Sequence, residues 1–138
     1  MAYKIIFIDS DILLDVFLNR VPHYTSSADV LLLAEDKSYT FCTSVHALLN
    51  IHYLAKKTFG EKNARAAIKV ITTKLSIIAE DNNIVQSAIE SNFGDFEDAV
   101  QYYAAISVKC DIIITRNLKD YKQSTIPVLT AEQFLSTL

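Results

Sequence analysis

Tight turns must be rare in this chain, because it has only two glycines and two prolines among 138 residues. Sheets built from antiparallel hairpins depend on such residues at their turns. Their scarcity argues against an all-β architecture. We therefore expect helices to make most of the connections between strands.

The chain also lacks an excess of positive charge. Thirteen lysines and arginines stand against sixteen aspartates and glutamates, which gives a formal net charge of −3 and a pI of about 5.5. A strongly basic protein would have indicated direct binding to nucleic acid. This balance argues against an unaided electrostatic hold on long DNA, but it leaves room for a phosphate substrate bridged by a metal ion.

Long apolar runs and metal-binding cysteine motifs are missing too. No apolar run reaches the ~18 residues of a membrane span, and the first residues lack the longer apolar stretch and cleavage site of a signal peptide. Cys42 and Cys110 have no CxxC or CxxxH spacing, so we expect reduced, mostly buried thiols and no disulfide. These absences predict a cytoplasmic protein without a membrane partner.

What the sequence does contain is a regular alternation of strand-like and helix-like segments. Residues 4–8 and 111–116 each contain a continuous apolar run, typical of fully buried parallel strands. Pro127 places a further strand at an edge of the sheet. The remaining expected elements are strands at 38–44, 75–81 and 125–130, and helices at 11–18, 23–36, 45–58, 61–75, 82–92, 95–109 and the C-terminus. This order predicts one domain over 1–138, an α/β fold in three layers (α/β/α) with a central parallel sheet.

Carboxylates are expected to gather at one end of that sheet. Asp9 directly follows the first buried strand, Asp120 lies in the loop after the strand at 111–116, and Asp98 lies on the first turn of the helix at 95–109. Ligands of parallel sheets bind beyond the carboxyl ends of the strands. Three neighbouring carboxylates repel one another, and Mg²⁺ or Mn²⁺ would remove that penalty, polarise a phosphoryl oxygen and activate a bound water for attack. Asp9, Asp98 and Asp120 are therefore the predicted metal ligands and catalytic residues.

The acids near the first strand also have simpler structural interpretations. Asp9 could end the strand and accept hydrogen bonds from the next turn. Asp11 could be nothing more than an acid in the first turn of the following helix, where it complements the helix dipole. Asp15, one helical turn further on, is expected to be a solvated residue on an exposed face.

A second group of acids has the spacing of a helix cap. Asp95 and Asp98 occupy N-cap and N3 positions, with Asp95 expected as the cap. Glu97, between them, is expected to face away. The histidines lack the spacing of a metal motif and are expected at the surface or the edge of the core, namely His23, His46 and His52.

Four segments, taken in order, resemble the PIN domain, a small metal-dependent nuclease fold that includes VapC-type ribonuclease toxins. They are "IIFIDSDILLDVFLNR" (5–20), "TSVHALLNIHYLAKK" (43–57), "DFEDAVQYYAAISVKCDIIITRNLKDY" (95–121) and "IPVLTAEQFL" (126–135). The resemblance spans essentially the whole chain. It implies an acidic site for one or two Mg²⁺ or Mn²⁺ ions, hydrolysis of RNA, an antitoxin protein as partner, and a homodimer.

The resemblance also assigns roles within the site. Asp9 corresponds to the first family acid, Asp98 to the third and Asp120 to the fourth. Supporting or substrate-contacting positions are then Ser10, Asp11, Asp95 and Asn117, and Arg116 is added to them because it lies close to Asp120 in the chain. The second family acid is usually a glutamate, and Asn50 stands at that position. An asparagine can coordinate through its carbonyl oxygen, but it removes one negative charge and so weakens a second metal most.

Three functions remain open at this point. The first is a metal-dependent endoribonuclease, the toxin of a toxin–antitoxin pair. The second is a catalytically weak PIN-like module that binds RNA or protein, which Asn50 and the acidic pI favour. The third is a phosphatase of the haloacid dehalogenase class, whose paired aspartates also follow an apolar strand. Ile12 and the leucines after it depart from that class.

Overall fold

Five short strands form one parallel sheet in the computed structural model, which describes residues 3–138. The central strand β1 (Ile5–Ile8) pairs with β2 (Thr40–Ser44) on one side and with β4 (Ile112–Ile114) on the other. The two edge strands are β3 (Ser76–Ile78) and β5 (Val128–Leu129). The strand order is β3-β2-β1-β4-β5, so the predicted parallel sheet and the predicted edge position of the last strand are both confirmed.

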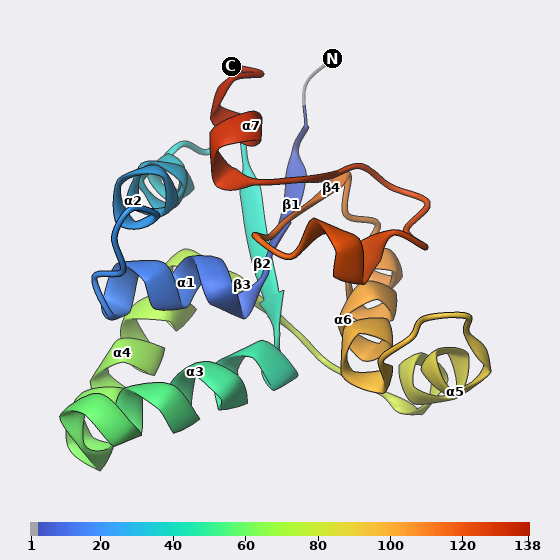
Figure 1. Cartoon of the computed structure of the whole chain (residues 1–138), viewed down its shortest axis with the longest axis horizontal. Coiled ribbons are helices and arrows are strands. Elements are labelled where there is room, and N and C mark those ends of the chain that lie inside the picture. The colour runs from blue at the N-terminus through green and yellow to red at the C-terminus, as the bar shows by residue number, and fades with distance from the viewer. Residues whose placement is uncertain (1–2) are drawn as a thin grey trace.

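Helices make the connections, as the scarcity of turn residues predicts (Figure 1). They are α1 (Ser10–Phe17), α2 (Tyr24–Leu32), α3 (Val45–Phe59), α4 (Glu61–Lys74), α5 (Asn82–Glu90), α6 (Phe96–Ser107) and α7 (Ala131–Leu135), with 3-10 turns η1 (Leu33–Glu35) and η2 (Leu118–Tyr121). The expected break between the third and fourth helices lies at Gly60. Its φ of 85° belongs to the region that favours glycine, so the chain can turn there without strain.

The two faces of the sheet are buried in separate apolar cores. Ile6 and Ile8 pack with residues of α1, α2, α3, α4 and α7, whereas Phe7 between them packs with residues of α5 and α6. Because successive strand residues point to opposite faces of the sheet, one continuous apolar run contributes side chains to both cores. Figure 1 shows the sheet between these two sets of helices, which confirms the three-layer arrangement.

The two cysteines lie in the core on the α5–α6 side. Cys42 and Cys110 are free and buried, and their Sγ atoms are 3.3 Å apart. The hydrogen bond between them, followed by burial, raises the pKa of the Cys110 thiol. Buried free thiols agree with the prediction from their spacing. Among the helices of residues 3–138, none is both long enough and apolar enough to cross a membrane.

The sheet register brings the ends of two strands together. Because β1 and β4 are neighbours, Asp9 and Thr115 follow them side by side at the carboxyl edge. The backbone N–H of Asp9 donates to the carbonyl oxygen of Ile114 over 3.0 Å. α1 begins at once after Asp9, and α3 begins directly after β2 ends at Ser44. Three strands therefore end, and two helices begin, at the same edge of the sheet.

Candidate active site

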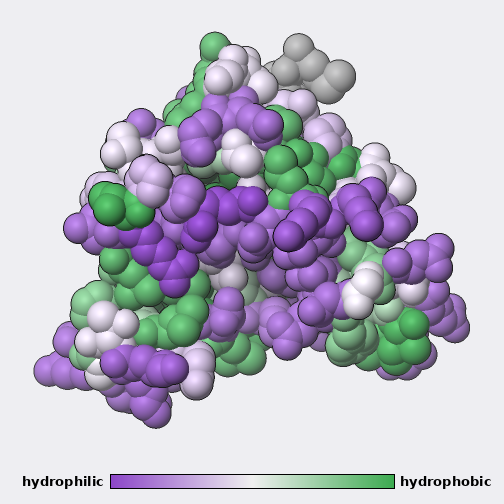
Figure 2. All heavy atoms as spheres, in the orientation of Figure 1, coloured by the Kyte–Doolittle hydropathy of each residue, from purple (hydrophilic) through white to green (hydrophobic). Residues whose placement is uncertain are grey.

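A polar cavity of about 320 Å³ opens at this carboxyl edge. All three predicted ligands line it, Asp9 from the tip of β1, Asp98 from α6 and Asp120 from η2. The other predicted residues on its wall are Ser10, Asp11, Asn50, Arg116 and Asn117. Figure 2 shows hydrophilic side chains in a band across the middle of the molecule, with apolar patches above and below it. The tertiary structure therefore brings together residues that are more than 100 positions apart in the chain.

Asp9 is the most tightly held of these acids. Its Oδ1 accepts hydrogen bonds from the Ser10 N–H (2.6 Å) and Gln101 Nε2 (3.2 Å), and its Oδ2 accepts from Thr115 Oγ1 (2.9 Å) and the Tyr121 hydroxyl (3.3 Å). Burial, and then the charge of Asp9, raises the pKa of Tyr121 well above its usual range, so that this phenol stays a donor. Asp9 as a whole residue is only 6% exposed. Donors from four parts of the chain hold both of its oxygens in place.

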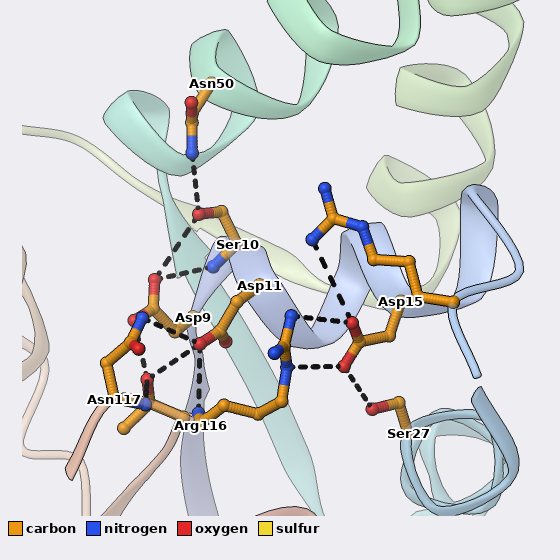
Figure 3. Close-up of polar contacts among 10 residues, drawn as sticks. Asp9, Ser10, Asp11, Asp15, Ser27, Asn50, Arg116 and Asn117 are labelled. Carbon is orange, nitrogen blue, oxygen red and sulfur yellow. Dashed lines mark hydrogen bonds and ion pairs between the residues drawn. The ribbon is translucent and has the colours of Figure 1, made fainter. Parts of the chain in front are cut away.

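Asp11 carries an oxygen that the protein leaves without a hydrogen bond. Its Oδ2 accepts from the Arg116 N–H (2.9 Å) and Asn117 Nδ2 (3.2 Å), as Figure 3 shows. It also lies 3.2 Å from Thr115 Oγ1, whose single proton it shares with Asp9. Asp11 Oδ1 is buried and has no hydrogen-bond partner among residues 3–138. Burial, and then the charge of Asp9, raises the pKa of Asp11 to about 7. A cation or a proton at Oδ1 would relieve this buried acceptor.

The pKa of Asp98 is also raised by its surroundings. Burial, and then the charges of Asp120, Asp95 and Asp9 in that order of size, together raise the pKa of Asp98 to about 6. A divalent ion in the cavity would oppose both effects, because its positive charge favours the ionised form of each carboxylate.

The described residues do not form a closed ion cage. Within residues 3–138, no group of three or more aspartate, glutamate, histidine or cysteine side chains is close enough together to hold a metal ion directly. The cavity is nevertheless roomy, since one water occupies only about 30 Å³ of liquid volume. Mg²⁺ commonly keeps several waters and uses only one or two carboxylates. The oxygen donors, and the unsatisfied oxygen of Asp11, therefore fit a partly hydrated divalent cation.

The N-cap of α6 was predicted correctly, but the direction of the Glu97 side chain was not. Asp95 accepts from the Glu97 N–H (2.7 Å) as the N-cap, and it lines an adjoining cavity of about 360 Å³ together with Asp98 and Asp120. Glu97 does not face away. Its Oε2 lies 3.4 Å from His46 Nε2 at the rim of the acidic cavity, because the first turns of α3 and α6 lie side by side.

The expectation of a solvated Asp15 was wrong. Its side chain is fully buried, and Arg116 donates to it through Nε (3.0 Å) and Nη2 (2.9 Å). Ser27 donates through Oγ (3.0 Å), and Arg20 Nη1 lies 4.0 Å from Oδ1. Figure 3 shows this second cluster beside the one around Asp9. The cause is tertiary, because α2 and the loop after β4 cover this side of α1.

Asn50 reaches the acids only through another side chain. Its Nδ2 donates to Ser10 Oγ (3.0 Å), and that hydroxyl lies 3.5 Å from Asp9 Oδ1.

Gln101 is a residue of the site that the sequence analysis did not predict. It accepts from Ser44 Oγ (2.9 Å) and donates to Asp9, so it joins the end of β2 to the end of β1. Its position one turn after Asp98 on the same helix was the available signal.

The raised pKa values of Asp11 and Asp98 predict an unusual pH dependence of stability. The ordinary value of 3.8 becomes about 7 for Asp11 and about 6 for Asp98, so the native state keeps protons that the unfolded state has released. The contribution of these groups to the free energy of unfolding is therefore greatest below about pH 4 and falls as pH rises to about 7. Without metal, the melting temperature should therefore fall as the pH rises from about 4 to about 7. Mn²⁺ should raise it again by binding the native state.

Asp11→Asn is the variant that isolates this effect. It should raise the metal-free melting temperature near pH 7.5 by about 2–4 °C and flatten its pH dependence. Differential scanning calorimetry in EDTA at several pH values, for wild type and variant, measures both. An unchanged melting temperature in the variant would contradict a strained carboxylate at this position.

The sequence matches the PIN domain family over residues 5–119. It is 29% identical to ribonuclease VapC1 of Aquifex aeolicus (strain VF5) over 134 residues, which cover 94% of this chain and 92% of that protein. The fold is similar to VapBC-1 from nontypeable Haemophilus influenzae, with a TM-score of 0.69, 16% identity and coverage of 94% of this chain and 99% of that chain. It is also similar to VapBC2 from Rickettsia felis bound to a promoter DNA fragment, with a TM-score of 0.67, 19% identity and coverage of 91% of this chain and 97% of that chain.

Proposed function

The chain belongs to the PIN domain family, and on that premise we propose that it is a metal-dependent endoribonuclease and the toxin of a bacterial toxin–antitoxin pair. The observation that carries the proposal is the cavity into which three separate segments bring Asp9, Asp98 and Asp120. The similarity to a protein named as a ribonuclease supports RNA as the substrate. The same similarity, together with the family, gives no support to a haloacid dehalogenase-type phosphatase.

The proposed residues divide into ligands and residues that position them. A Mg²⁺ or Mn²⁺ ion held by Asp9, Asp98 and Asp120 would supply charge neutralisation and Lewis acidity at the scissile phosphodiester. Asp98, with a pKa of about 6, is mostly ionised at neutral pH, and Thr115 and Tyr121 orient Asp9 by their hydrogen bonds. In the reaction, the oxygen of a water would bond to phosphorus while the bond from phosphorus to one ribose oxygen breaks. One proton of the water would pass to that leaving ribose oxygen, and the other would stay with the new phosphate group.

The test is cleavage of a labelled single-stranded RNA by the purified protein. Cutting should require Mn²⁺ or Mg²⁺, and it should stop in EDTA and return when the metal is added back in excess. Cutting that continues undiminished in EDTA would contradict the proposal. Absence of cutting with every divalent ion tested would favour the second candidate, a PIN-like module that binds RNA without hydrolysing it.

Asn50 is the observation that favours this second candidate. Replacing it with glutamate should restore a negative charge at the cavity wall and lower the half-saturating Mn²⁺ concentration for cleavage about 10-fold. Asn50→Gln is the matched control, because it lengthens the side chain equally without adding charge. A gain of cleavage in Asn50→Glu alone would identify the native protein as the weak module. Equal metal affinity in all three proteins would show that Asn50 lies outside the metal site.

The proposed partner is an antitoxin protein. The support is the similarity of fold to chains from toxin–antitoxin complexes, including one from Klebsiella pneumoniae with a TM-score of 0.67, 22% identity and coverage of 91% of this chain and 96% of that chain. Co-expression with the product of a small adjacent reading frame, followed by co-purification and loss of RNA cleavage, tests the pairing. The homodimer also stays a proposal, and light scattering of the purified chain tests it.

A further inference from the structure

Two arginines converge on one buried carboxylate at the rim of the acidic cavity. Arg116 binds Asp15 with two parallel hydrogen bonds, whereas Arg20 contacts the same carboxylate through a single 4.0 Å ion pair. Asp15 itself is fully buried, while the arginine side chains are 34% exposed for Arg20 and 29% exposed for Arg116. One negative charge thus holds two positive ones, and the cluster keeps an excess of one positive charge.

The cluster belongs to the same cavity as the proposed metal ligands. Arg20 and Arg116 line it together with Asp9, Asp98 and Asp120, so that cations and carboxylates occupy different parts of one wall. The backbone N–H of Arg116 also donates to Asp11, which ties the cationic part to the acidic part over 2.9 Å. An anionic ligand can therefore reach the arginines while a neighbouring group of the same ligand faces the acids.

The chemistry of arginine points to phosphate as that anionic group. A guanidinium presents its N–H groups as a rigid fork that matches phosphate oxygens. Arg20 has its donors available, because a contact of 4.0 Å is longer than a hydrogen bond. Before a ligand arrives, Asp15 restrains Arg116 by two hydrogen bonds and attracts the Arg20 guanidinium, which reduces the entropy lost on binding. A simple structural role explains the Arg116 pair, but it does not explain the second guanidinium at the cavity.

We infer that Arg20 and Arg116, held by Asp15, form a subsite that binds a backbone phosphate of the RNA next to the scissile one. The inference rests on the proposed function for the identity of the substrate. It assigns Asp15 a positioning role, because that carboxylate is buried and cannot reach the RNA. The subsite would set how the strand runs through the cavity, with one phosphate at the arginines and the next at the acids.

Arg20→Gln is the most direct test, because it leaves the two hydrogen bonds between Arg116 and Asp15 in place. The assay is fluorescence anisotropy of a short fluorescein-labelled single-stranded RNA with Ca²⁺ in place of Mg²⁺, with probe integrity checked on a gel. Arg20→Gln should weaken binding about 3–10-fold and reduce the slope of log K against log salt by about 0.7. Arg65→Gln is the matched control, since Arg65 is an exposed arginine on α4 whose partner is Glu61, and it should change neither quantity.

The outcomes separate this inference from the proposed function. Binding by Arg20→Gln equal to wild type, at every salt concentration, would overturn the subsite even if the wild type cleaves RNA. Equal losses in Arg20→Gln and Arg65→Gln would also overturn it, because they would indicate a diffuse charge effect. Weaker binding of an acidic protein partner, with RNA binding unchanged, would assign the arginines to that partner instead. A selective loss in Arg20→Gln with no cleavage by any variant would support the subsite and reject the nuclease.

Discussion

Replacing Asp9 with asparagine is expected to lower RNA cleavage about 1,000-fold or more while the protein stays folded. A metal ligand at the scissile phosphate contributes several kcal/mol of transition-state stabilisation, and each 1.36 kcal/mol corresponds to a factor of ten in rate. Asparagine has nearly the same shape, so its carbonyl oxygen can still accept from the Ser10 N–H and Gln101. The hydroxyls of Thr115 and Tyr121 can rotate to accept from the new amide.

The measurement is single-turnover cleavage of labelled RNA at saturating Mn²⁺, with circular dichroism to check the fold. Asp29→Asn is the matched control, because Asp29 is an exposed aspartate on α2 and the substitution is chemically identical. Equal cleavage by wild type and Asp9→Asn would mean that a contaminant or another site cuts the RNA. Loss of cleavage in Asp29→Asn as well would show that the assay responds to general charge.

The largest effect on stability is expected for Asp15→Ala. Removing one partner of a buried ion pair leaves the other charge without compensation, which commonly costs 3–5 kcal/mol. The cost here should be at the low end, about 3 kcal/mol, because Arg116 and Arg20 remain 29% and 34% exposed and water can solvate them. The corresponding fall in melting temperature is about 10 °C for a chain of this length. Ser27 also loses its hydrogen-bond acceptor.

Urea denaturation of wild type, Asp15→Ala and Asp15→Asn measures the free energy of unfolding directly. Asp15→Asn should lose less than alanine, because the amide oxygen still accepts from Arg116 or Ser27. Asp29→Ala serves as the control for loss of an exposed aspartate, and it should change stability by less than about 0.5 kcal/mol. A wild-type midpoint in Asp15→Ala would show that the buried pair contributes nothing to folding and that its role lies elsewhere.

The elements of the fold were predictable because their signals are local. The apolar runs at Ile5–Ile8 and Ile112–Ile114 are too continuous for a strand with one solvated face, so they had to be buried on both faces of a parallel sheet. Gly60 and Pro127 marked a helix break and an edge strand by their backbone properties. The predicted helix ends differ from the observed ones by a few residues, since fraying and 3-10 turns at helix ends follow packing.

The candidate site was predictable only in part. A carboxylate directly after a buried strand lies at the sheet edge in any parallel fold, so Asp9 could be placed at the cavity from the sequence. The donors to Asp9 could not be found in this way, because Gln101 and Tyr121 approach it from elements about 100 residues away. Periodicity describes one segment at a time and contains no information about which other segment will cover it.

By itself, the sequence determined the alternation of strands and helices, the parallel sheet, and the edge at which Asp9, Asp98 and Asp120 meet. The tertiary structure alone decided that Asp15 is buried and that Arg20 and Arg116 gather around it. Local patterns arise from interactions between residues that are near in the chain, and those are encoded in the spacing of residue types. A buried charge is stable only where distant segments supply its hydrogen bonds and counter-charges, and that supply exists only after the chain has folded.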